Sequence, residues 1–239
     1  MNPKIIFSGF LMLLVCTFLI AGCQTQAPRL PAYLGQVEGL HDVQNPHPQS
    51  LPSAINQVGV LVMTDSSFPN SALPLSPDML AILENRLVKK MDEFFGLQVI
   101  PIRPEQPLQP TGNVGPFTHL AKAHKLDFML LVVLSSTEEE SHIEIGEETM
   151  MTRMSGVSID NEALAELAVL NADSGKIALY ATGHGASSME QLAVPIGEDY
   201  PGRENARDIL RANAAQNALD QALLALQRQW GRSLVTGGG

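Results

Sequence analysis

Residues 128–134 read Phe128-Met129-Leu130-Leu131-Val132-Val133-Leu134, the most apolar strand-like run of the chain beyond its first 22 residues. A strand with one face in water alternates apolar and polar side chains, whereas a strand covered on both faces is apolar throughout. This run therefore predicts a strand in the middle of a sheet with other elements packed on both of its faces.

Upstream of this run, the sequence from Ser76 predicts a helix with a marked beginning and end. Ser76 suits the N-cap, Pro77 the first helical position, and Asp78 complements the helix dipole. Apolar residues recur at helical spacing to about Phe94, and Gly96 fits a stop signal. The spacing predicts one apolar face directed at a sheet.

Two further strands and a short helix complete the first half. The apolar run Val58–Met63 predicts a second buried strand, and Leu97–Ile102 a third. A proline-rich loop separates the latter from a short helix over about Pro116–His124, which precedes the strand at 128–134. The predicted order is strand, helix, strand, helix, strand.

The second half predicts a hairpin followed by a long helix. Leu164–Leu170 and Lys176–Ser187 flank the turn-forming residues Asn171–Gly175, where Gly175 can adopt positive φ. The closing helix runs from about Glu204 to Trp230, ended by Gly231. Its apolar stripe comprises Ile209, Leu210, Ala214, Ala218, Leu219, Leu223 and Leu226.

Together these elements predict a single α/β (α+β) domain. It has a mixed sheet of about five strands with two main helices packed on it, in the order β-α-β-α-β-β-β-α. We expect the domain to span residues 57–230. The sequence contains no internal repeat of 20 to 50 residues.

The amino terminus has the pattern of an export signal over residues 1–22. Lys4 is followed by an apolar run from Ile5 to Ile20, too short to span a bilayer, and then by small residues. Ile20-Ala21-Gly22-Cys23 resembles the lipobox of bacterial lipoproteins. The resemblance implies cleavage before Cys23 and acylation of its thiol, the alternative being an ordinary secretory signal with an incidental cysteine.

The resemblance also implies a location in the cell envelope. Gln24 rather than Asp after the cysteine favours the outer membrane over the inner membrane, with the domain facing the periplasm. Residues 23–56 contain five prolines, which predicts a lipidated cysteine followed by a semi-extended tether. Tyr33 and Leu34 could still pack on the domain. Residues 231–239, with three terminal glycines, are expected to form a flexible tail.

The cysteine content and the charge balance limit the kinds of site and partner that the mature chain can have. Cys16 leaves with the signal and lipid consumes Cys23, so no thiol remains for a disulfide or a metal site. Lys4 is the only charged residue of the signal, which leaves 14 basic and 25 acidic residues. This acidic balance argues against nucleic acid and anionic lipid headgroups as partners, because both need a basic face.

The element order resembles a group of lipoproteins whose compact α/β domain is like the amino-terminal domain of the translocation protein TolB. The group includes the curli-secretion lipoproteins, the lipoprotein activators of penicillin-binding proteins and the rhombotail lipoproteins. The likeness to the rhombotail type is carried by Leu126-Asp127-Phe128 and by Leu170–Lys176. It implies a non-enzymatic accessory protein of the bacterial envelope.

One acidic segment suggests a metal site as an alternative. Residues 138–148 include six glutamates and His142, with Met150, Met151 and Met154 close behind. Oxygen ligands suit hard cations and thioethers suit copper(I). The spacing matches no EF-hand loop, so a solvated strand end or loop and ordinary packing methionines are the favoured interpretation, and we expect no metal site.

The histidines do not predict an active site. Gly183-His184-Gly185 could place a general base, but no serine or acid is placed to complete a triad. A strand bend at which two backbones approach closely explains the two glycines better. His119 and His124 are five residues apart on the predicted short helix, which is not one face. We therefore expect no catalytic residue, no cofactor and no enzymatic activity.

The sequence thus predicts a membrane-anchored periplasmic lipoprotein. Its expected role is non-enzymatic docking or assistance in envelope assembly, cell-wall synthesis or secretion, with the membrane and an envelope protein as partners. The main alternative is a periplasmic metal-binding or metal-sensing lipoprotein that uses residues 138–154, and a hydrolase is the third.

Overall fold

The computed structural model describes most of the chain from residue 27 to residue 236. The described residues are 27–37, 40, 55–68, 70–72, 74–104, 106, 108–145, 154–192 and 203–236. In this part of the chain no helix is long and apolar enough to cross a membrane.

The sheet has five strands in the spatial order β2-β1-β3-β4-β5. These strands are β1 (Gln57–Asp65), β2 (Gln98–Pro101), β3 (Phe128–Ile145), β4 (Met154–Asn171) and β5 (Ile177–Leu192). Strand β1 pairs in parallel with β2 and β3, whereas β3, β4 and β5 pair antiparallel. The predicted single domain with a mixed five-stranded sheet is confirmed.

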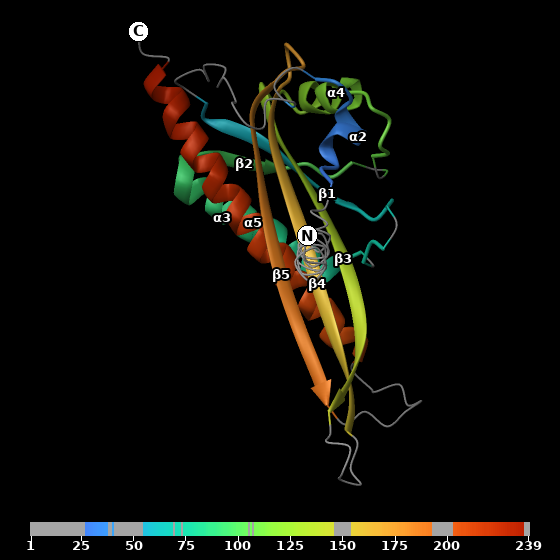
Figure 1. Cartoon of the computed structure of the whole chain (residues 1–239). Coiled ribbons are helices and arrows are strands. Elements are labelled where there is room, and N and C mark those ends of the chain that lie inside the picture. Colours follow the sequence, from blue (N-terminus) through green and yellow to red (C-terminus); the bar gives the residue numbers. More distant parts are fainter. Residues whose placement is uncertain are drawn as a thin grey trace, which may run out of the picture.

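Helices cover both faces of this sheet (Figure 1). They are α2 (Leu30–Leu34), α3 (Pro77–Phe95), α4 (Gly115–Ala123) and α5 (Arg203–Thr236). One apolar core lies between the sheet and the two main helices α3 and α5, and a second core lies under α2 and α4. Leu130 of β3 belongs to the first core and the neighbouring Leu131 to the second, as expected for a strand covered on both faces.

Two locally encoded features agree with their predictions. The Ser76 hydroxyl accepts a hydrogen bond from the Met79 amide at the start of α3, and Gly96 ends the helix with φ of 63°. In the β4–β5 hairpin, the Asn171 side chain accepts hydrogen bonds from the amides of Asp173 and Ser174, and Gly175 has φ of 68°. These signals involve only residues within one turn, so they can be found in the sequence.

The tether predicted for residues 23–56 is wrong for residues 30–34, which form helix α2, and Tyr33 and Leu34 pack on the domain as the sequence allowed. Helix α2 packs on the sheet with Leu30, Tyr33 and Leu34 buried, and Val37 and Leu40 are buried as well. The prolines that suggested a spacer do not prevent this, because Pro31 lies in the first turn of α2, where its missing N–H is not needed. The domain therefore begins near Arg29.

The strands β3, β4 and β5 are much longer than predicted. Each has 16 to 18 residues, and β1 pairs with β3 only as far as Ser135. Beyond this point β3, β4 and β5 continue as a three-stranded ribbon (Figure 1). Residues 138–145, predicted to be a solvated strand end or a loop, therefore form the outer half of β3. The strand was predicted too short because glutamate is depleted in strands and this segment is rich in glutamate.

Helix α5 differs from its prediction at two places. It continues through Gly231 to Thr236, so the predicted flexible tail is wrong for residues 231–236, while residues 237–239 lie outside the described residues. A single glycine costs a helix only about 1 kcal/mol relative to alanine and need not end it. Ile209 is exposed rather than part of the apolar stripe, whereas Leu210, Ala214 and the later stripe residues are buried.

Candidate functional site

The strongest concentration of buried polar groups lies between the sheet and the start of α2. Glu166 of β4 is fully buried there. Its Oε1 accepts a hydrogen bond of 2.7 Å from the Tyr180 hydroxyl on β5. Its Oε2 accepts hydrogen bonds from the backbone amides of Arg29 and, at 3.0 Å, Leu30. One carboxylate thus joins β4, β5 and the amino-terminal segment.

Arg29 brings a second acid into this cluster. Its guanidinium lies 3.9 Å from the centre of the Phe68 ring, and its Nε lies 3.9 Å from Oδ2 of Asp65. Asp65 is the last residue of β1, and its Oδ1 accepts a hydrogen bond of 2.8 Å from the Ser67 amide. The positive charge therefore lies between two buried carboxyl groups and a half-buried aromatic ring.

Burial raises the pKa values of one carboxyl group and two tyrosine hydroxyls here. Burial raises the pKa of Glu166, and the Tyr180 hydroxyl and the two amides oppose this only in part. Burial and the nearby Glu166 raise the pKa of Tyr180. The pKa of Tyr33 is raised as well, by burial and then by Asp65. Tyr180 consequently stays a hydrogen-bond donor at all ordinary pH values.

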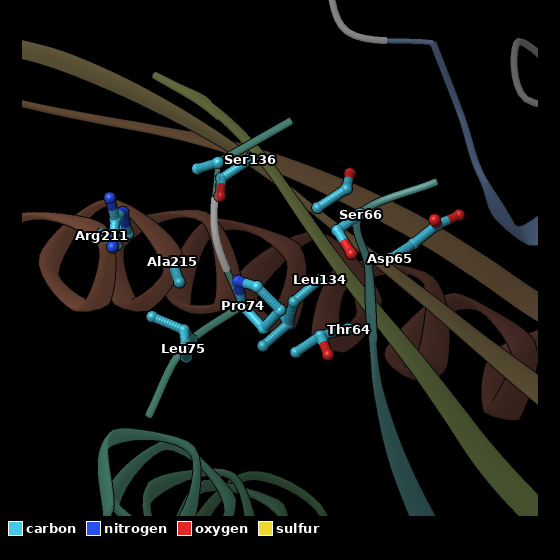
Figure 2. Close-up of a pocket in the computed structure, with 11 residues that line it drawn as sticks. Thr64, Asp65, Ser66, Pro74, Leu75, Leu134, Ser136, Arg211 and Ala215 are labelled. Atoms are coloured by element: carbon cyan, nitrogen blue, oxygen red, sulfur yellow. The ribbon is translucent and has the colours of Figure 1, made fainter. Parts of the chain in front are cut away.

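A small cavity lies at the carboxyl end of β1, between the sheet and α5, on the opposite face of the sheet from Glu166 (Figure 2). Ligands of open α/β sheets often bind at such strand ends. The cavity measures about 20 Å³, which accommodates one water molecule. The cavity is too small for an organic substrate.

This geometry favours a structural role for the cluster over catalysis. A general base must reach a substrate proton. Glu166 is fully buried, and its two oxygens already accept three hydrogen bonds. The cluster therefore fastens α2 to the sheet.

The acidic segment singled out in the sequence is divided between two faces of β3. Glu138 accepts hydrogen bonds of 2.7 and 3.1 Å from Arg211, and Glu140 pairs with Arg207, both on α5. Glu139 is exposed on the opposite face. Among the residues that the structure describes, no three His, Cys, Asp or Glu side chains gather as a metal site.

Several residues of the metal hypothesis cannot be placed. Glu147, Glu148, Met150 and Met151 lie outside the described residues. Glu144 lies within β3 and Met154 begins β4, but their side chains are not among those described. Cys23, the predicted lipidation site, also lies outside the described residues.

The glycines around His184 meet the backbone of α5. A Cβ atom on Gly183 would lie 2.2 Å from the Ala218 carbonyl oxygen, and one on Gly185 would lie 2.1 Å from that of Ala214. This contact confirms the close approach of two backbones that the sequence suggested. His184 points to the other face and is exposed, as are His119 and His124 near α4.

Sequence reasoning missed the buried cluster completely. The available signal was Glu166 itself, a lone charge within the apolar run Ala163–Leu170. Charged residues are almost never fully buried unless they are paired, so such a residue indicates a buried partner. Its partners could not be identified from the sequence, because Arg29 and Leu30 lie more than 130 residues away.

Comparison with known proteins adds a distant set of similar structures. No protein-family model and no curated protein matches the chain. A Helicobacter pylori structure described as a neuraminyllactose-binding hemagglutinin homolog is 11% identical, with a TM-score of 0.43, over 84% of this chain and 97% of that one. The minor lipoprotein of Acinetobacter baumannii is 9% identical, with a TM-score of 0.37, over 75% and 96%. Rare lipoprotein B of Shewanella oneidensis is 10% identical, with a TM-score of 0.32, over 74% and 98%.

Proposed function

We propose that this chain is a lipoprotein acylated at Cys23, which anchors a non-enzymatic docking domain at the periplasmic face of the bacterial outer membrane. The observation that carries the proposal is the lipobox-like Ile20-Ala21-Gly22-Cys23 directly after an apolar export signal. Two or more acyl chains hold a protein stably on a bilayer. The anchor therefore defines where the domain acts.

The structure supports docking rather than chemistry as the task of the domain. The buried Glu166 is taken up by internal hydrogen bonds, and Glu138 and Glu140 by arginines of α5. The likeness to rhombotail and related lipoproteins points to envelope assembly, cell-wall synthesis or secretion as the process.

The anchor is tested by replacing the cysteine. Cys23→Ser should abolish labelling with radioactive palmitate and leave the signal uncleaved by the lipoprotein peptidase. The matched control is Cys16→Ser, which removes the other cysteine of the chain but lies inside the signal. Continued labelling of the Cys23→Ser protein would remove the anchor from the proposal.

Docking is tested by photo-crosslinking in intact cells. Three exposed positions sample different surfaces: Ile82 on α3, Leu224 on α5 and Ser188 on β5. A photoreactive amino acid is placed at one of them at a time in the full lipidated chain. We expect a defined envelope protein to be captured from one surface and not from the other two. Equal capture of many proteins from all three positions would contradict a specific docking role.

A further inference from the structure

The distance along the chain between the proposed anchor and the folded domain is very short. Five residues, 24–28, separate Cys23 from Arg29. Six peptide units reach at most about 20 Å when fully extended. The place where the chain joins the domain therefore cannot lie farther than this from the lipid-bearing residue.

The contacts of α2 make this attachment firm. Glu166 holds the amides of Arg29 and Leu30, and the side chains of Leu30 and Leu34 are almost completely buried. On the other side, the backbone amides of Gly112 and Asn113 donate hydrogen bonds of 2.8 and 3.0 Å to the carbonyls of Ala32 and Tyr33. Release of α2 would expose this apolar surface and leave the Glu166 carboxyl without two of its donors.

The rest of the proline-rich segment does not increase the possible distance between the domain and the membrane. Residues 35–56 join α2 to β1, and both of these elements belong to the same domain. A connection between two parts of one domain cannot lengthen the link to the membrane, whatever its length. A spacer formed by all 33 residues from 24 to 56 could extend over about 110 Å.

We propose that α2 is a docking element that keeps the domain against the lipid headgroups of the membrane in which Cys23 is anchored. This proposal rests on acylation of Cys23. The amino-terminal end of α2, at Arg29, lies next to the headgroup layer. The adjacent loop that carries Ser67 and Phe68 lies there as well. A partner must then be reached at the membrane surface and not across the periplasm.

The test uses the full lipidated protein in vesicles of phosphatidylethanolamine and phosphatidylcholine, which carry no net charge to repel the acidic chain, with an added lipid that bears a nitroxide headgroup. Ser67→Cys provides the only free thiol of the mature chain, because Cys23 carries lipid, and Ser67 is exposed close to Arg29. A fluorophore on this thiol is quenched when it lies near the headgroups. Native tether length should give strong quenching.

Two insertions of the same 20-residue Gly/Ser segment separate the short tether from a long spacer. Inserted between Ala27 and Pro28, the segment lengthens the link by about 25 Å on average, and quenching should fall by roughly half. Inserted between Gln49 and Ser50, the segment lengthens only the connection from α2 to β1, and quenching should stay unchanged. Thermal melting of both variants checks that the domain remains folded.

The possible results are distinct. Equal effects of both insertions, or weak quenching in the protein without insertion, would overturn the proposed role of α2 while leaving the lipid anchor intact. Failure of the protein to float with the vesicles would overturn the proposed anchor itself, and the membrane contact with it.

Discussion

The hydroxyl of Tyr180 donates a hydrogen bond of 2.7 Å to Oε1 of Glu166, and both side chains are buried beneath α2. Tyr180 lies on β5 and Glu166 on the neighbouring β4. A carboxyl group in this position must be protonated or fully supplied with donors, because an unsatisfied buried charge is strongly destabilising. This relationship allows the role of the cluster to be measured through stability.

Protonation of Glu166 should stabilise the fold. The folded-state pKa lies above the ordinary value of 4.5, so the contribution of Glu166 to stability is complete below that value and is lost as the pH rises through the folded-state pKa. Between about pH 5 and pH 7, the wild type should therefore lose stability relative to Glu166→Gln, which cannot ionise. Urea unfolding of both proteins at the two pH values measures this. A pH-independent difference would contradict the raised pKa.

Tyr180→Phe removes one of the three donors to Glu166 without changing the size of the ring. The loss of a buried partner should lower the free energy of unfolding by about 1–3 kcal/mol. In a Glu166→Gln background, Tyr180→Phe should lower the free energy of unfolding by less, because a buried neutral amide loses less than a buried carboxylate when a hydrogen-bond donor is removed. A double-mutant cycle by urea unfolding gives the coupling energy. Equal losses in the two backgrounds would show that the Tyr180 hydroxyl is not coupled to the charge of Glu166.

Gly183→Ala should disturb the packing of β5 on α5. The new methyl group would lie 2.2 Å from the Ala218 carbonyl oxygen and 2.3 Å from the Ala222 amide nitrogen. Overpacking of this kind typically costs about 1–3 kcal/mol, and backbone atoms of a helix cannot move aside singly. The matched control is His184→Ala on the same strand, which is exposed and should change stability by less than about 0.5 kcal/mol. A neutral Gly183→Ala would mean that α5 can shift freely over β5.

Arg211→Ala should lower the free energy of unfolding much more than Arg103→Ala does. Both arginines approach a glutamate to 2.7 Å, but the Arg211 and Glu138 side chains are 5% and 12% exposed, whereas those of Arg103 and Glu84 are 74% and 22% exposed. Loss of one partner from a buried pair costs about 3–5 kcal/mol, and an exposed pair contributes about 0–1 kcal/mol. Chemical denaturation of the two variants checks the ranking. Similar losses would place the outer half of β3 outside the cooperative fold.

Calcium, zinc or copper(I) should not raise the melting temperature of the domain. Glu138 and Glu140 already pair with arginines, so a metal ion would have to displace Arg211 and Arg207. A genuine site would stabilise the protein by about 2.7 kcal/mol at 100 times its dissociation constant. A melting shift with one metal, lost in a Glu144→Gln and Met151→Leu variant, would favour the metal-binding alternative over docking.

The sequence by itself determined the elements whose signals are local. The Ser76 cap and Gly96 stop of α3, the turn at Asn171–Gly175 and the apolar run at 128–134 each depend on neighbours within one turn or one strand. Hydrogen bonds of caps and turns form between residues close in sequence, so residue type and spacing suffice to predict them. The predicted export signal and its cysteine also depend on sequence pattern alone.

Only the tertiary structure decided where α2 packs, how far β3 extends and what Glu166 contacts. A five-residue helix is too short to show a periodic apolar face, and its burial depends on β4, more than 130 residues away. The glutamates of outer β3 oppose strand formation until Arg207 and Arg211 of α5 neutralise them. Such contacts arise when the topology brings distant segments together, and the residues at either end carry no local record of the partner that they will meet.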